Sequence, residues 1–158
     1  MELISRGTAS IVSFNMSEDD IRHIMTRPYT MASSDGGLVL PTEGRPHPRD
    51  YGAFARRLAV YVRERHVVGL EFAVRSMTTL PALVFGLTDR GQLREGAFAD
   101  IAVFDPAKVR DTATYADPHH LAEGMSYVLV NGVVVVDGGT FTEALPGRVL
   151  RKPVTGER

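Results

Sequence analysis

The stretch from Tyr29 to Gly37 limits the possible folds of this chain more than any other. An apolar, strand-like run ends there in two serines, which are followed by Asp35 and a pair of glycines. A βα-barrel presents catalytic groups in this way, because its active site lies at the carboxyl ends of its strands. The glycines leave room beside the carboxylate for a substrate or a metal. Ser-Asp-Gly is also a common turn sequence, and the tripeptide alone favours a turn, so the strand interpretation depends on the rest of the chain.

Composition narrows the class of protein. The chain has 158 residues, the size of one ordinary domain with a sizeable core. Its formal net charge is −1 and it has no basic run, which argues against nucleic acid as a partner. It contains no cysteine, so disulfides, cysteine metal ligands and thiol nucleophiles are excluded. No apolar run approaches membrane-spanning length and no secretory segment is evident, so we expect a cytoplasmic location and no membrane partner.

The segment before Asp35 predicts a strand–helix–strand unit. Ala9 to Phe14 is β-prone. Ser17 is a suitable N-cap for a helix, because three acidic residues follow it in the first turn, and Pro28 limits that helix. The strand that carries Asp35 follows directly. Such a unit with short connections implies a parallel sheet.

The loop from Gly36 to Asp50 is rich in glycine, proline and charge, and it contains His47 and Arg49. Long loops at the functional end of a barrel shape substrate access, and an arginine can bind a carboxylate through two hydrogen bonds. His47 and Arg49 are therefore candidates to face a substrate. A solvated loop in which the arginine holds backbone carbonyls explains the pattern equally well, and the spacing does not decide between the two.

The next segments predict helices and then strands. A helix capped by Asp50 presents one apolar stripe, which indicates core packing; the stripe consists of Tyr51, Phe54, Ala55, Leu58 and Val62. Further helices are expected over residues 70–77 and, with Pro81 in the first turn, up to residue 85. Residues 100–106 predict a strand ended by proline, and Asn131-Gly132 between two valine-rich runs predicts a hairpin with a type I′ turn.

His119 and His120 raise the question of a metal site, since imidazoles are common metal ligands. Adjacent residues in an extended segment point in opposite directions, and no third partner stands at ligand spacing. We therefore assign this pair to a surface loop.

Several segments of this chain resemble the N-acyl-D-amino-acid deacylases, the D-aminoacylase family of the amidohydrolase superfamily. The similar segments are spread over nearly the whole chain: residues 14–36, 47–49, 73–78, 86–91, 96–105, 130–132 and 146–151. The segment 99–105 (Ala-Asp-Ile-Ala-Val-Phe-Asp) is shared by many amidohydrolases. The Ser-Asp-Gly and His-Pro-Arg segments together point to this family.

The resemblance implies a metal-dependent (βα)8 barrel with a small β-sandwich, and an N-acyl-D-amino acid as substrate. It implies that Asp35 follows the last barrel strand and acts as general base on a zinc-bound water, and then as acid to the leaving amine. Ser34, Gly36, His47 and Arg49 are the corresponding candidates for substrate binding. A metal lowers the pKa of its water and a nearby carboxylate moves the proton, so this chemistry is self-consistent.

The chain departs from the family in length and in ligands. A complete barrel needs about 200 residues or more, and the family's His-x-His pair and metal-binding cysteine are absent here. We expect no metal to be bound by this chain alone. The predicted fold is α/β: a remnant of the last βα units of the barrel (residues 1–90), followed by a small β module with a hairpin from the C-terminal part of the β-sandwich (91–151) and a loose tail (152–158).

Three functions follow as alternatives. The first is a C-terminal fragment of a deacylase that is inactive unless an N-terminal part supplies the metal ligands. The second is a non-catalytic module that forms homo-oligomers or binds a partner, because a truncated barrel exposes strand edges and apolar surface. The third, another amidohydrolase such as a hydantoinase-like or deaminase-like enzyme, is the weakest, since those relatives lack a match to His47-Pro48-Arg49.

Overall fold

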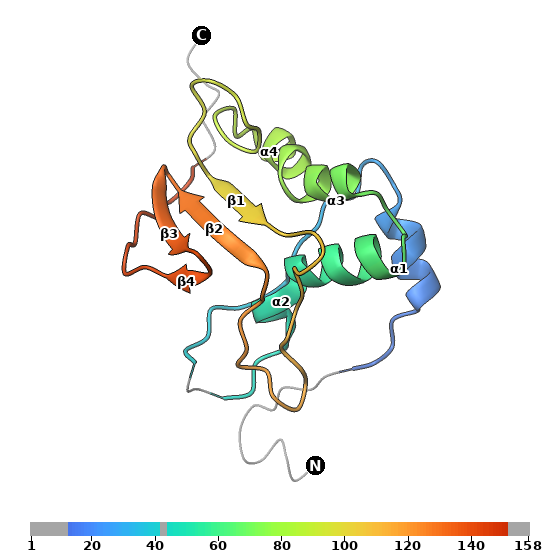
Figure 1. The fold of residues 1–158 in the computed structure, drawn as a ribbon. Coiled ribbons are helices and arrows are strands. Elements are labelled where there is room, and N and C mark those ends of the chain that lie inside the picture. Colours follow the sequence, from blue (N-terminus) through green and yellow to red (C-terminus); the bar gives the residue numbers. More distant parts are fainter. Residues whose placement is uncertain (1–12, 42–43, 152–158) are drawn as a thin grey trace, which may run out of the picture.

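The computed structural model describes residues 13–41 and 44–151, and within them it contains helices followed by one sheet (Figure 1). The helical elements are α1 (Glu18–Met25), α2 (Arg49–Arg56), the π-helical η2 (Arg57–Glu64), α3 (Leu70–Met77) and α4 (Thr79–Phe85). The strands are β1 (Ile101–Phe104), β2 (Met125–Val130), β3 (Val133–Asp137) and β4 (Thr140–Phe141). None of the described helices is long and apolar enough to cross a membrane. The predicted tail, residues 152–158, lies outside the described residues.

The consecutive helices α2 and η2 lie at the centre of the core, between α1 and the sheet (Figure 1). One buried apolar cluster joins α1 to η2, and it consists of Met25, Ala59, Val60 and Tyr61. A second joins α2 and η2 to α3 and to the segment after β1, and it consists of Ala55, Leu58, Ala73 and Val109. Phe104 of β1 and Met125 of β2 pack against this second cluster. The predicted apolar stripe is confirmed as core packing at Ala55 and Leu58, whereas Phe54 is 45% exposed.

The predicted helices form, and their ends follow from local chemistry. Ser17 is confirmed as the N-cap of α1, since its Oγ accepts a hydrogen bond from the backbone N–H of Asp20 at 3.4 Å. Helix α3 covers the predicted residues, and α4 carries Pro81 in its first turn, where the missing N–H costs nothing. Gly86 ends α4 with a φ of 72°, a left-handed conformation that glycine adopts without strain.

The predicted strand before Asp35 is wrong, because residues 29–40 contain no strand. The backbone N–H groups of residues 35, 36 and 37 each donate to a side-chain oxygen, those of Ser33 (3.3 Å), Ser34 (3.2 Å) and Asp50 (3.0 Å). Such local bonds compete with a strand ladder. Asp35 itself has a φ of 49°, outside the β region. The carboxylate of Asp50 thus accepts the backbone N–H of Gly37. Helix α2 begins at Arg49 with no side-chain cap, so the prediction that Asp50 is its N-cap is wrong.

The predicted parallel sheet is also wrong in the described residues, where the sheet is antiparallel in the order β1-β2-β3-β4. Of the β-prone run 9–14, residues 9–12 lie outside the described part and 13–14 are not in a strand. The hairpin is confirmed: β2 and β3 pair through Val128 and Val136. Asn131 and Gly132 both have positive φ, 51° and 82°, as a type I′ turn requires.

Two glycines allow close packing, Gly52 between α2 and the β module and Gly124 within the β module. A Cβ on Gly52 of α2 would lie 2.6 Å from the Cβ of Asp111. A Cβ on Gly124 would lie 2.5 Å from the backbone N and Cα of Val109, and Gly124 has a φ of 87°. Real Cβ atoms do not come this close, so both contacts depend on glycine.

The contact between Gly124 and Val109 yields a stability prediction. We expect Gly124→Ala to lower the free energy of unfolding by about 1–3 kcal/mol, because the new methyl group overlaps immovable backbone at a left-handed position. The measurement is chemical denaturation followed by circular dichroism. Gly147→Ala is the control, since Gly147 is exposed and its Cβ would meet nothing within 4 Å. Equal stability of the two variants would contradict the packing described here.

Candidate functional site

The structure brings the predicted catalytic residue into contact with one predicted substrate-binding residue. Nη2 of Arg49 lies 2.9 Å from Oδ2 of Asp35, and the Asp35 side chain is 83% exposed. An ion pair this exposed contributes only about 0–1 kcal/mol to folding. The pair therefore places two charged groups side by side at the surface, where a ligand can reach both, and adds little to stability.

Ser34 and Gly36 shape the turn around Asp35. Oγ of Ser34 accepts the backbone N–H of Gly36, as described above. A Cβ on Gly36 would lie 2.9 Å from Oδ1 and 3.1 Å from Cα of Asp50, so a larger residue would push the turn away from α2. Their contacts within the protein are structural, and their contact with a substrate stays a prediction.

His47 links Arg49 to the β module. Its Nδ1 accepts a hydrogen bond from the backbone N–H of Arg49 at 3.1 Å, and its Nε2 lies 3.2 Å from the hydroxyl of Tyr115. Because Nδ1 is an acceptor here, neutral His47 carries its proton on Nε2 and donates it to Tyr115. A continuous series of contacts thus runs from Tyr115 through His47 and Arg49 to Asp35.

Further bonds hold the loop 44–48 against the segment that follows residue 112. Arg45 donates to the carbonyl of Ala116 at 3.1 Å. Nε2 of His119 lies 3.2 Å from the carbonyl of Gly44, and its Nδ1 lies 2.8 Å from the hydroxyl of Tyr51. A carbonyl only accepts, so Nε2 of His119 donates to it and Nδ1 accepts from Tyr51. The β module therefore positions the loop that carries His47.

Sequence reasoning missed Tyr51 and Tyr115, and it placed His119 in a surface loop without a role. Each of the pairs Tyr51–His119 and Tyr115–His47 is separated by 68 positions along the chain. Short-range spacing carries no signal for contacts this distant, and only the close docking of α2 on the β module brings them together.

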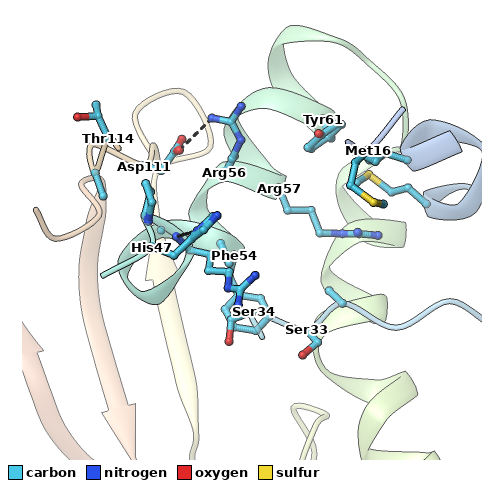
Figure 2. A pocket seen from close by; sticks show the side chains of 18 of the residues that line it. Met16, Ser33, Ser34, His47, Phe54, Arg56, Arg57, Tyr61, Asp111 and Thr114 are labelled. Carbon is cyan, nitrogen blue, oxygen red and sulfur yellow. Dashed lines mark hydrogen bonds and ion pairs between the residues drawn. The ribbon is translucent and has the colours of Figure 1, made fainter. Parts of the chain in front are cut away.

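A cavity of about 740 Å³ opens beside these residues (Figure 2). Ser33, Ser34, His47 and Arg49 contribute to its lining from the side of Asp35. Its opposite side is lined by α1 and η2, and Figure 2 shows Arg57 extended across it between Met16 and Ser33. Ligand pockets commonly have volumes of about 300–1,000 Å³, so the cavity is large enough for a small molecule.

Burial changes the acid–base behaviour of two residues that line this cavity. Burial lowers the pKa of Arg57 from its ordinary value, and interaction with Tyr61 partly opposes this. Burial also raises the pKa of Tyr61, and the negative charge of Glu18 adds to the effect. Both shifts have desolvation as their main cause.

The donors in the described residues do not fit the zinc site that the resemblance implies. No group of three or more histidine, cysteine, aspartate or glutamate side chains converges in the part of the chain that the structure describes. A catalytic zinc ion is held by three protein ligands with one position left open. Asp35 has Arg49 as its charged neighbour, which disfavours a second cation there. No chemical step is therefore assigned to a metal held by these residues.

Comparison with known proteins identifies the family. The model of the amidohydrolase family matches residues 8–136, and the chain belongs to this family. Within it, the similarity to N-acyl-D-amino-acid deacylases is confirmed. The chain is 43% identical to an N-acyl-D-aspartate deacylase, 45% to an N-acyl-D-glutamate deacylase and 46% to a D-aminoacylase, all from Alcaligenes xylosoxydans xylosoxydans. These matches cover 90–91% of this chain but only 28–29% of the relatives, so the chain spans less than a third of their length.

Solved structures agree. A crystal structure of D-aminoacylase is similar with a TM-score of 0.75 and 45% identity, over 82% of this chain and 27% of that one. The N-acyl-D-glutamate deacylase of Bordetella bronchiseptica, solved with zinc and a phosphonate inhibitor that mimics the tetrahedral intermediate, is similar with a TM-score of 0.71 and 47% identity. That match covers 79% of this chain and 27% of the enzyme. The described helices and antiparallel sheet therefore belong to the fold of these deacylases.

The contact between Tyr115 and His47 is testable by NMR. We expect Tyr115→Phe to shift the ¹⁵N resonance of His47 Nε2, because the bond to the hydroxyl is lost, while Nδ1 keeps the signature of an acceptor. The free energy of unfolding should change by no more than about 1 kcal/mol, since the ring is retained. Tyr127→Phe on β2 is the control, and identical His47 resonances in both variants would contradict the contact.

Proposed function

We propose that this chain is the C-terminal part of a metal-dependent N-acyl-D-amino-acid deacylase, which hydrolyses an amide to a D-amino acid and a carboxylate. The single observation that carries the proposal is the Asp35–Arg49 pair beside a cavity, in a chain 43–46% identical to three such deacylases. The pair supplies a proton-transfer group next to a group that binds carboxylates.

Asp35 is the proposed proton carrier. Its carboxylate is exposed, so it can take a proton from the attacking water and return it to the leaving nitrogen. The positive φ of Asp35 turns the backbone at this residue. We assign Asp35 this role because it matches the position of the general base in the family motif.

Arg49 is the proposed anchor for the carboxylate of an N-acyl-D-amino acid. Its guanidinium already contacts one carboxylate, that of Asp35, and a bound substrate would compete for the same donors. Binding of substrate would thus release Asp35 for proton transfer. His47 orients Arg49 through its backbone N–H, and Ser34 and Gly36 are the proposed contacts nearest to Asp35.

The absence of a strand over residues 29–35 of the described structure fits this proposal. A strand needs neighbours to pair with, and among the described residues the N–H of Ala32 bonds to the carbonyl of Ser76 on α3 and to no strand. We propose that residues 29–35 become the last strand of the barrel when the rest of a deacylase supplies the neighbouring strands. The metal ligands would also come from outside the described residues.

Measurements on the chain alone test the proposal that its metal site is incomplete. We expect elemental analysis of the purified chain to find no stoichiometric zinc, and hydrolysis of N-acetyl-D-amino acids to stay at the level of buffer, because no three-ligand group is described. Stoichiometric zinc with turnover in the same sample would contradict this account. It would require a complete metal site within the chain or between its copies.

A non-catalytic, self-associating module is the second candidate, and the surface of α4 favours it. Leu83, Val84 and Phe85 are exposed by 65%, 55% and 60%. Neighbouring apolar side chains this exposed are typical of surfaces that another chain covers. Sedimentation of the same sample distinguishes the two candidates: a stable oligomer that neither hydrolyses substrate nor binds it would favour the module.

A further inference from the structure

The side chain of Arg57 is buried in the wall of the cavity, and no described carboxylate pairs with it. It is 8% exposed, and its Nε and Nη2 atoms have no hydrogen-bond partner in the described part of the chain. Its neighbour Arg56 differs, because Nη1 of Arg56 pairs with Oδ2 of Asp111 at 3.1 Å. Of these two adjacent arginines, Arg56 is paired near the surface, whereas Arg57 is buried and two of its nitrogen atoms lack a partner among the described residues.

Burial of an unpaired guanidinium is costly, since the charge loses water and gains no partner. Arginine stays protonated in proteins, so deprotonation does not relieve this cost. Among the described residues that line the cavity, Asp111 is the only carboxylate, and Arg56 already binds it. An anion that enters from outside would therefore gain the two free donor atoms of Arg57 at a buried position, where charged hydrogen bonds are strong.

The side chains that line the cavity around Arg57 indicate the chemistry of the rest of such a ligand. The lining on this side is apolar and rich in methionine; its members are Met16, Ile21, Met25, Met31 and Tyr61. Methionine side chains adapt their shape to different apolar ligands. The cavity volume of about 740 Å³ leaves room for a ligand considerably larger than acetate.

We propose that this cavity is a binding site for small carboxylates with an apolar body, in which Arg57 binds the carboxylate and the methionine-rich wall binds the body. The cavity also borders Arg49, but Arg57 comes from η2 and supplies a second charge that is not part of the Asp35–Arg49 pair. The inference deepens the proposed function and rests on it for the source of the ligand. Both an N-acyl-D-amino acid and the free acyl carboxylate released from it carry this combination of groups.

The test is calorimetric titration of the purified chain with octanoate. Acetate lacks the apolar body and octanol lacks the carboxylate, so both should bind more weakly than octanoate. We expect Arg57→Leu to weaken octanoate binding by at least about tenfold, the effect of losing a charged hydrogen-bond pair, and to leave octanol binding unchanged. Titration with N-hexanoyl-D-alanine tells whether the acylated substrate or the free acyl carboxylate is preferred.

Arg148→Leu is the matched control, since it removes one positive charge from an exposed residue that does not line the cavity. It should bind octanoate as the unaltered chain does. If Arg57→Leu does not fold, the NMR signal of the Arg57 Nε–H group in the unaltered chain provides the readout, and it should shift with octanoate and stay in place with octanol.

Three results would overturn the proposal: no binding of octanoate, equal binding by the Arg57→Leu variant, or an unmoved Nε–H signal. An Arg57→Leu variant that is more stable than the unaltered chain, with no octanoate binding by either, would show instead that the buried guanidinium only destabilises the fold. Neither outcome bears on Asp35, since the hydrolysis and zinc measurements above test the proposed function independently.

Discussion

The close contact between α2 and the segment after β1 holds this structure together. Gly52 lets the helix approach Asp111, and Gly124 lets the following strand approach Val109, which is fully buried. Val109 belongs to the second apolar cluster, and Phe104 and Met125 of the strands pack against the same cluster, so these two contacts help to place the sheet against the helices. The rest of the arrangement therefore depends on glycine at positions 52 and 124.

The contact between α2 and the segment after β1 also determines the geometry of the candidate site. Docking of α2 places the segment around Tyr115 and His119 over the loop before α2, so hydrogen bonds from the β module fix His47, and His47 in turn holds the backbone of Arg49. Asp35 is reached through Arg49. A small β module thus has a direct role at a site whose charged groups all come from the first half of the chain.

Sequence reasoning predicted what local chemistry determines and failed where distant partners decide. Ser17 with its acidic neighbours specifies the start of α1, and Asn131-Gly132 specifies the hairpin turn, because each signal acts within a few residues. The strand before Asp35 was mispredicted, since a strand exists only beside another strand and the serines satisfy the backbone locally. Arg49 was a candidate to bind a substrate carboxylate; in the structure it pairs with Asp35, and its contact with a substrate stays a prediction. The sequence carries no signal for the burial of Arg57, because burial depends on tertiary packing.

The central claim is that this chain supplies the proton-transfer group of a deacylase whose remaining parts lie elsewhere. The most direct test mixes the chain, in the presence of zinc, with the N-terminal part of the Alcaligenes D-aminoacylase that lacks the region matched here. We expect hydrolysis of an N-acetyl-D-amino acid to appear on mixing and to disappear with Asp35→Asn. The melting temperature of that variant should stay close to that of the unaltered chain, because the side chain is exposed. A stable complex without hydrolysis, or equal hydrolysis with Asp35→Asn, would contradict the central claim.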